Sequence, residues 1–237
     1  MAYSAPSVRV SFDGVLFDMD GTIVDSTEAV VKHWHAIGEE IGVDPKVILE
    51  TSHGRRSIDT LKLLSPDKAN WDYIRHVEGL LPKLHGDTAV EIPGARALLE
   101  QIMASNLPLA IVTSGTVPLV TGWLDVLNLP HPEHLITAES VAEGKPNPSC
   151  YLLGRDRIGM SDPTKNVLVL EDSPAGIRSG KAAGCKVVGL VTSHKIEHVL
   201  DADWVVKDLE SVKLVQGPEG KVTVEISNSL VRSSSSL

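Results

Sequence analysis

The chain has 237 residues, which is enough for one or two domains with a sizeable hydrophobic core. Its formal net charge of -9 argues against a nucleic-acid-binding protein, because such proteins present a basic face to the phosphates. The two cysteines are too few for a disulfide framework, and no apolar run approaches membrane-spanning length. We therefore expect a cytoplasmic monomer with no nucleic-acid or membrane partner.

A short apolar stretch near the N-terminus leads into two closely spaced acidic residues. Residues 15–17 are too few for a helix and predict a buried strand. Asp18 and Asp20 follow, and residues two apart in an extended chain point to the same side. Gly21 allows a sharp turn, and the side chain of Thr22 can form a hydrogen bond nearby. Two carboxylates this close repel each other unless a cation or a proton lies between them, and hard oxygen ligands suit Mg²⁺. The alternative is a solvated acidic turn, which the preceding strand and the following Gly-Thr argue against.

Helical spacing of apolar residues dominates the segment that follows. Gly42 is expected to end the first helix, and Asp44 and Pro45 are typical of the cap and first position of the next. The helices are expected at residues 27–41, from residue 45 onward, at 58–64 and from 71 to residue 82 or soon after. His33 and His35 are expected on the surface of the first of these helices, with a role in the mouth of the cap as the alternative. We expect residues 27–91 to form a helical cap domain, inserted into a core domain of residues 1–26 and 92–237.

After residue 92, short apolar strands alternate with helices. The strands are expected at 109–112, 167–170, 187–191 and 204–206, and the helices at 95–104, 118–127, 149–158 and 174–183. Each strand is continuously apolar, as expected for parallel strands that are buried on both faces. The alternation predicts an α/β fold with a Rossmann-like parallel sheet and right-handed crossovers. Residues 212–215 and 222–226 are expected to form a terminal hairpin.

Polar residues cluster where these strands end, which is where open α/β sheets bind ligands. Asp18 and Asp20 follow the first strand, residues 113–115 (Thr-Ser-Gly) the second, and residues 171–172 (Glu-Asp) the third, with Lys145 in a loop between the last two. Each group alone has an ordinary explanation: a strand-to-helix turn, a solvated lysine, or acidic residues that favour a helix N-terminus. Together they bring carboxylates, hydroxyls and a cation to one edge of the sheet.

The segment from Asp18 to Thr22 resembles the DxDGT signature of the haloacid-dehalogenase-like (HAD) phosphatases, and the other three groups match this family's remaining motifs in order. The resemblance implies a Mg²⁺-dependent phosphatase that acts on small phosphomonoesters. It implies that Asp18 is the nucleophile that becomes an aspartyl-phosphate. It also implies that Asp20 protonates the leaving alcohol and then activates water.

The same resemblance assigns the phosphate-binding groups. It implies that Ser114 donates a hydrogen bond to the phosphoryl group, with Thr113 as the alternative if the register differs by one residue. Gly115 belongs to the same loop, and Lys145 neutralises the nucleophile and the phosphoryl oxygens.

The resemblance also implies a metal site. Asp172 would hold Mg²⁺ together with Asp18 and the backbone carbonyl of Asp20, and Glu171 would support the metal or its waters. Without the metal, this many carboxylates would repel a phosphate dianion, so we expect an absolute requirement for Mg²⁺.

Residues 52–56, Ser-His-Gly-Arg-Arg, lie between two expected cap helices. Together with the motifs above, they resemble fungal glycerol-phosphate phosphatases and 2-deoxyglucose-6-phosphate phosphatases, over almost the whole chain. The resemblance implies sugar or polyol phosphates as substrates. We expect His53, Gly54 and Arg55 to line the substrate entrance, although chemistry alone is equally consistent with an exposed turn. The expected cap hinges lie near Thr27 and at residues 91–94.

Two other functions stay open at this point. The first is a phosphoglucomutase of the same superfamily, which returns the phosphoryl group to a sugar. Similar mutases often carry a histidine where this chain has Val30, so hydrolysis is favoured. The second is a catalytically silent metabolite-binding relative, although the intact acidic and basic motif residues argue against it. A dehalogenase is a weaker alternative, because such relatives generally lack the aspartate that corresponds to Asp20.

Overall fold

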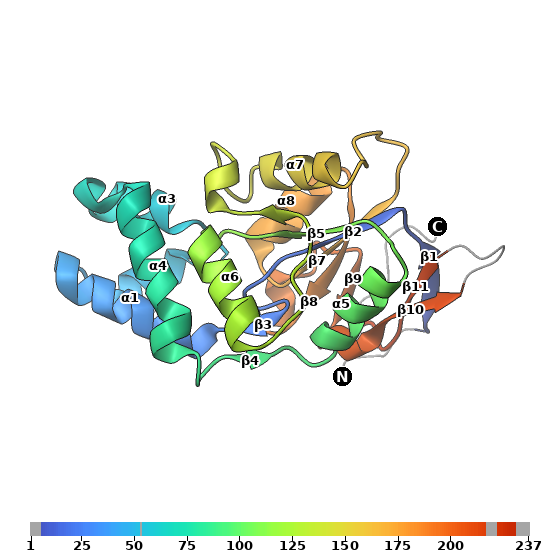
Figure 1. The fold of residues 1–237 in the computed structure, drawn as a ribbon, viewed down its shortest axis with the longest axis horizontal. Coiled ribbons are helices and arrows are strands. Elements are labelled where there is room, and N and C mark those ends of the chain that lie inside the picture. Colours follow the sequence, from blue (N-terminus) through green and yellow to red (C-terminus); the bar gives the residue numbers. More distant parts are fainter. Residues whose placement is uncertain (1–5, 53, 217–221, 231–237) are drawn as a thin grey trace.

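The computed structural model describes residues 6–52, 54–216 and 222–230. Its centre is a parallel sheet with the strand order β6-β5-β2-β7-β8-β9 (Figure 1). The strands of this sheet are β2 (Gly14–Phe17), β5 (Leu109–Val112), β6 (Leu135–Ile136), β7 (Val167–Glu171), β8 (Lys186–Leu190) and β9 (Trp204–Val206). The predicted α/β fold is confirmed. The strand order reverses at β2, between β5 and β7, and such a switch point is where open sheets bind ligands.

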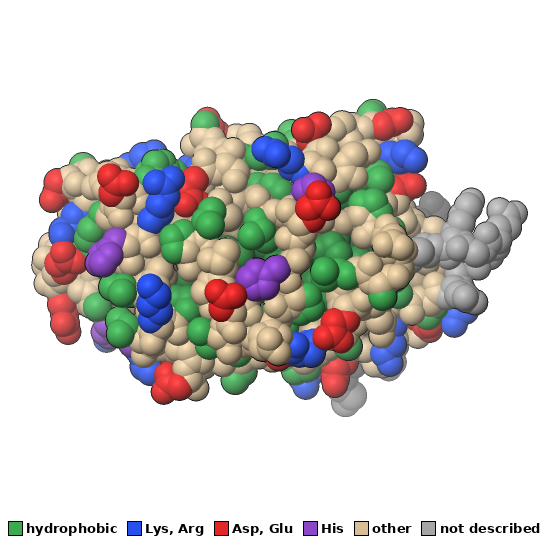
Figure 2. Space-filling model, in the orientation of Figure 1, with side chains coloured by type: hydrophobic (Ala, Val, Ile, Leu, Met, Phe, Trp, Pro, Cys, Tyr) green, Lys and Arg blue, Asp and Glu red, His purple; other side chains and the backbone are tan. Residues whose placement is uncertain are grey.

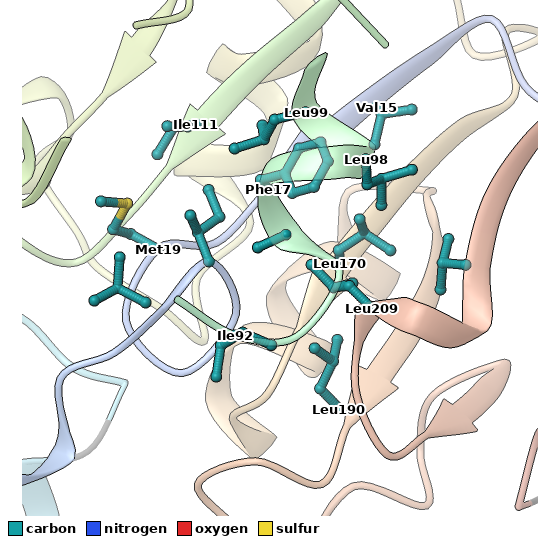
Figure 3. Close-up of a cluster of buried hydrophobic side chains, with 14 of the residues drawn as sticks. Val15, Phe17, Met19, Ile92, Leu98, Leu99, Ile111, Leu170, Leu190 and Leu209 are labelled. Atoms are coloured by element: carbon teal, nitrogen blue, oxygen red, sulfur yellow. The ribbon is translucent and has the colours of Figure 1, made fainter. Parts of the chain in front are cut away.

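Helices cover both faces of the sheet, and successive residues of β2 face opposite sides. The helices are α5 (Ala95–Ala104), α6 (Val117–Val126), α7 (Ser149–Arg157) and α8 (Pro174–Ala182). Val15 and Phe17 pack with α5 and α6, as Figure 3 shows for Leu98 and Leu99. Leu16 packs on the other face with α7 and α8. Each such large apolar side chain contributes about 1.5–3 kcal/mol on burial, so the two-sided core fixes β2 firmly in the sheet.

A helical insertion, residues 27–91, lies at one end of the molecule (Figure 1). Its helices are α1 (Thr27–Ile41), α2 (Pro45–Ser52), α3 (Ser57–Leu64) and α4 (Trp71–His85). They bury a hydrophobic cluster of their own, which contains Trp34, Ile48, Leu61 and Ile74. At the base of the insertion, β3 (Val24–Asp25) pairs antiparallel with β4 (Val90–Glu91). The insertion therefore has a separate core and a two-stranded connection to the sheet.

A small antiparallel sheet with the order β1-β11-β10 lies at the opposite end (Figure 1). Its strands are β1 (Val8–Ser11), β10 (Val212–Gln216) and β11 (Val222–Ile226). The two strands of the predicted hairpin are present, and their turn lies outside the described residues. The sequence analysis did not predict β1. Short 3₁₀ helices complete the fold: η1 (Pro66–Lys68), η2 (Ala138–Ser140), η3 (Ile196–His198) and η4 (Leu209–Ser211).

Helix α4 continues through Pro82 and ends at His85, soon after the proline, as expected from the sequence. A proline inside a helix removes one hydrogen bond and costs stability. Here its ring packs against α6, where a methyl group at Gly122 would lie only 2.6 Å from Pro82 Cγ. The contact is reciprocal, because a methyl group at Gly79 of α4 would lie 2.9 Å from Pro118 Cβ of α6. We call this contact the α4–α6 seam. Its close packing offsets the cost of the proline and joins the insertion to the core.

Charged side chains of both signs are interspersed on the face of the molecule in Figure 2, and the described residues form no broad basic area there. Among the helices of the described segments, none combines the length and the apolar character needed to cross a membrane.

A buried carboxyl group, Glu78, lies beside the seam. It accepts a hydrogen bond from the Ser57 hydroxyl (2.5 Å) and one from the backbone N–H of Thr116 (2.8 Å), at the start of α6. Burial raises the pKa of Glu78 to about 7, although these hydrogen bonds oppose the shift. Glu78 thus links two elements of the insertion to the core at a place where ionisation is costly.

We predict that Glu78→Gln stabilises the protein at pH 8 more than at pH 5. The pKa of Glu78 rises from 4.5 to about 7 on folding, so the folded state holds an extra proton between these values. The stability of the wild type therefore falls as pH rises through this window, by up to about 3 kcal/mol. Glutamine keeps the shape and does not titrate; its amide oxygen can accept from the Thr116 N–H while its NH₂ group donates to the Ser57 hydroxyl oxygen.

Urea unfolding of both proteins from pH 5 to pH 8 checks this prediction. Glu100→Gln, at a half-exposed position on α5, is the matched control and should show no such trend. If the difference in the free energy of unfolding between the wild type and Glu78→Gln stayed constant with pH, the prediction would be contradicted.

Candidate active site

The carboxyl ends of β2, β5 and β7 bring together three of the predicted site residues. The ammonium of Lys145 donates to Asp18 Oδ1 (2.5 Å), to Glu171 Oε1 (2.7 Å) and to the backbone carbonyl of Val112 (3.1 Å). All three side chains are buried. The lysine, which the sequence also allowed as a solvated loop residue, is therefore the buried counter-ion of two carboxylates.

Glu171 has both carboxylate oxygens occupied by hydrogen bonds. Besides Lys145, Oε1 accepts from the Tyr151 hydroxyl (3.1 Å), and Oε2 accepts from the backbone N–H (2.8 Å) and hydroxyl (3.0 Å) of Ser173. At Gly176, a methyl group would occupy the space of the Glu171 carboxylate. Four hydrogen-bond donors, one of them Lys145, hold the Glu171 carboxylate in place, and the missing side chain at Gly176 leaves room for it.

Ligand oxygens of Asp18, Glu171 and Asp172 all lie within 4.8 Å of one another and form a buried acidic cluster. Burial raises the pKa of Asp18 to about 7 against the opposing charge of Lys145. Burial, Glu171 and Asp18 together raise the pKa of Asp172 well above its usual range. The single positive charge of Lys145 therefore cannot neutralise all three carboxylates when they are ionised. An all-oxygen donor set with this excess of negative charge fits a hard divalent cation such as Mg²⁺.

Asp20 lies at the rim of this cluster and is partly exposed to the pocket. It accepts a hydrogen bond from the Ser26 hydroxyl (2.6 Å), and burial raises its pKa while this bond opposes the rise. Gly21 adopts φ +88°, and the Asp172 carboxylate lies where its side chain would be. The turn after Asp20 therefore requires a glycine, and it brings Asp18 and Asp172 close together.

The loop after β5 presents two hydroxyl groups to the same pocket. Thr113 Oγ1 accepts a hydrogen bond from the backbone N–H of Gly115 (3.0 Å). The hydroxyl proton of Thr113 can therefore be donated to another group. The Ser114 hydroxyl donates to the backbone carbonyl of Gly54 in the insertion (3.0 Å). The structure thus gives the two candidate hydroxyls different surroundings: Thr113 is buried and Ser114 contacts the insertion.

Residues of the insertion line one side of the pocket. Gly54 and the exposed Arg55 are among them, whereas His53 lies outside the described residues. His35 is exposed, whereas the side chain of His33 is buried and lines the pocket, which fits the alternative of a place at the mouth of the cap. Burial lowers the pKa of His33 to about 4, so its ring is neutral. The spacing of residues along α1 did not reveal which face of the helix would meet the core.

The residues after β8 form a part of the site that the sequence analysis missed. The Ser193 hydroxyl donates to Asp172 Oδ2, and Thr192 Oγ1 donates to the backbone carbonyl of Gly21 (2.5 Å). Ser193 and His194 line the pocket. A signal for them existed, because Thr-Ser-His follows the apolar strand at 187–191 just as the other motifs follow theirs.

Comparisons with known proteins agree with this architecture. Residues 15–190 match the model of the haloacid dehalogenase-like hydrolase family. Glycerol-1-phosphate phosphohydrolase 1 of Saccharomyces cerevisiae is 37% identical over 225 residues, which cover 90% of this chain and 89% of that protein. 2-Deoxyglucose-6-phosphate phosphatase 2 of the same yeast is 35% identical over 245 residues, covering 94% and 99%.

A solved structure shares the fold at lower identity. The β-phosphoglucomutase of Clostridium difficile superposes with a TM-score of 0.69 at 20% identity, covering 85% of this chain and 93% of that one. The parallel sheet and the family match together define the chain as a hydrolase with an α/β core. The chain belongs to the haloacid dehalogenase-like hydrolases, and the resemblance drawn from its motifs is confirmed.

We predict that Asp172→Asn raises the melting temperature of the metal-free protein by a few degrees Celsius at pH 8. The substitution removes one of the mutually repelling buried charges. Excess Mg²⁺ should stabilise the wild type by mass action but should not stabilise this variant.

Thermal unfolding with chelator and with Mg²⁺ measures both effects. Asp72→Asn, at a fully exposed position on α4, is the control and should behave as the wild type does. An equal Mg²⁺ response in the wild type and in Asp172→Asn would argue against a metal at this cluster.

Proposed function

We propose that the protein is a Mg²⁺-dependent phosphatase that hydrolyses small sugar or polyol phosphate monoesters through an aspartyl-phosphate. The observation that carries the proposal is the surrounding of Asp18. Its carboxylate is buried beside a lysine and a second aspartate, and it lines a pocket that Asp20 also lines. The relatives named for glycerol 1-phosphate and 2-deoxyglucose 6-phosphate support this substrate class.

In the proposed first step, Asp18 attacks phosphorus and the bond from phosphorus to the leaving alcohol breaks. Lys145 holds Oδ1 of Asp18, which leaves the other carboxylate oxygen for the attack. Asp20, in its protonated form, donates its proton to the departing oxygen. In the second step, Asp20 takes a proton from water as the water attacks the phosphoryl group. Inorganic phosphate leaves and Asp18 is regenerated.

Charge neutralisation comes from Lys145 and from the proposed metal site. Asp18 and Asp172 would hold Mg²⁺, together with the backbone carbonyl of Asp20 that the family resemblance implies. Bound there, the ion would offset the charge of the carboxylates and of the transferring phosphoryl group. Because both Glu171 oxygens already accept two hydrogen bonds, we propose that Glu171 supports this site by holding Lys145.

The phosphoryl group also needs a hydroxyl donor, and the sequence left Thr113 and Ser114 open. The Ser114 hydroxyl already donates to the insertion. Thr113 keeps a proton for the phosphoryl group, and its oxygen is fixed by the N–H of Gly115. These contacts favour Thr113 as the donor. In this assignment Ser114 contacts the insertion, and Gly115 shapes the loop through its N–H bond to Thr113.

We further propose that residues 27–91 act as a cap that opens for substrate and closes over it. The β3–β4 pair joins the insertion to the sheet close to the hinges expected near Thr27 and at residues 91–94. Closure would exclude bulk water from the phosphoryl group. In the closed arrangement the pocket holds about 100 Å³, which favours small esters over protein substrates. Cys150 and Cys185 are buried free thiols, which supports a reducing compartment such as the cytoplasm.

We predict that Asp18→Asn abolishes phosphate release, with a loss of at least about 1,000-fold, because an amide is a poor nucleophile. The assay uses Mg²⁺ and a panel of glycerol phosphates, 2-deoxyglucose 6-phosphate, hexose 6-phosphates and phosphoglycolate. Asp13→Asn makes the same substitution before β2, away from the site, and should stay active. Excess chelator should abolish phosphate release by the wild type.

Other outcomes would point to other functions. If the wild type released no phosphate but interconverted glucose 1-phosphate and glucose 6-phosphate, it would be a mutase. Absence of both activities would leave a metabolite-binding relative.

We predict that Arg55→Ala changes the ranking of substrates in this panel, because its side chain is exposed at the pocket. Most of the change should appear in KM, and the largest effects are expected for esters with the most hydroxyl groups. Lys62→Ala on α3, another exposed cation of the insertion, is the control. Unchanged relative rates with Arg55→Ala would remove this residue from the substrate entrance.

A further inference from the structure

Two adjacent arginines of the insertion have opposite surroundings. Arg55 is exposed and lines the pocket, whereas Arg56 is only 3% exposed. A buried guanidinium is costly unless all of its donors are satisfied, so its contacts show what it holds.

All five N–H groups of Arg56 have an acceptor. Two of them form a bidentate pair with Asp59 on α3, from Nε (2.7 Å) and from Nη2 (2.9 Å). The other three reach the core and donate to the backbone carbonyls of Ala138 (3.2 Å), Val141 (2.7 Å) and Ala142 (3.0 Å). In this arrangement Arg56 has no donor left for a substrate.

The three carbonyls belong to the segment that leads directly to Lys145. Gly144 completes the contact, because a methyl group there would lie 2.7 Å from Arg56 Nε and 3.0 Å from its Cδ. The guanidinium therefore packs against the backbone one residue before the lysine. Lys145 in turn reaches Asp18 and Glu171. A single side chain of the insertion thus fixes the backbone from which the lysine extends.

We propose that Arg56 is a positioning residue, which places Lys145 against Asp18 only when the insertion is closed over the core. The inference rests on the proposed phosphatase function and adds a link from cap closure to charge neutralisation at the nucleophile. When the insertion moves away, the three carbonyls lose their donors and segment 138–145 is less constrained. The site is then complete only once substrate has been enclosed.

The substitution that tests this is Arg56→Lys. Lysine keeps the charge, but its single ammonium nitrogen has three N–H groups in place of the five of a planar guanidinium. It cannot bind the Asp59 carboxylate and the three carbonyls at the same time. We expect kcat to fall about 10- to 100-fold, the effect of a displaced catalytic group, with KM and the ranking of substrates nearly unchanged. Arg75→Lys is the matched control, because Arg75 also joins the insertion to the core, but through the side chain of Glu139, whereas Arg56 holds backbone carbonyls of the segment.

A second readout does not depend on activity. Hydrogen–deuterium exchange in peptides covering residues 138–146 should become faster in Arg56→Lys, while exchange in α5 stays as in the wild type. If the wild type released no phosphate at all, the proposed function would fail, and this exchange result would still decide whether Arg56 orders the lysine segment.

Gly144→Ala tests the same contact from the core side, including the case in which Arg56→Lys fails to fold. Its methyl group should displace the guanidinium and lower kcat in the same way. The double variant should lose little more than either single variant. A changed substrate ranking in Arg56→Lys would mean that Arg56 contacts the substrate. Unchanged kcat or unchanged exchange in both single variants would overturn the proposal.

Discussion

The rest of the site depends on one buried ion-pair arrangement, in which Lys145 bridges Asp18 and Glu171. Removing three charges from water is expensive, and the arrangement persists because every member has additional hydrogen-bond partners. Glu171 is saturated by Tyr151 and Ser173, and Lys145 also donates to the carbonyl of Val112. Because β2 packs against hydrophobic side chains on both faces of the sheet, Asp18, which directly follows β2, is held in a fixed position.

The sequence was a good guide wherever function follows from a position at a strand end. Asp18, Asp172 and the Thr113–Gly115 loop all lie where the alternation of strands and helices placed them. Helix boundaries were also accurate where a cap or a proline marked them, as at Pro45. At Pro82 the sequence allowed an end at the proline or soon after it, and the helix ends at His85. The packing of the proline ring against Gly122, far away in sequence, could not be foreseen.

Contacts between the insertion and the core were beyond sequence reasoning. Arg55 and Arg56 are identical in type and adjacent in the chain, yet one lies at the pocket and the other is buried. The local sequence offers Arg56 only Asp59, because the other three acceptors of its guanidinium lie more than eighty positions later in the chain. Glu78 is a similar case, since its partner Thr116 belongs to another part of the fold. For the same reason, the sequence left two places open for His33, the helix surface and the mouth of the cap.

The small sheet at the far end has a consequence for how the molecule is made. Val8 of β1 pairs with Ile226 of β11, so an early strand finds its partner among residues synthesised more than two hundred positions later. Closing so long a loop is entropically costly and belongs to the slow, non-local part of folding. On the ribosome, β1 therefore stays unpaired until β11 has been synthesised, and the pairing of the two strands completes the small sheet.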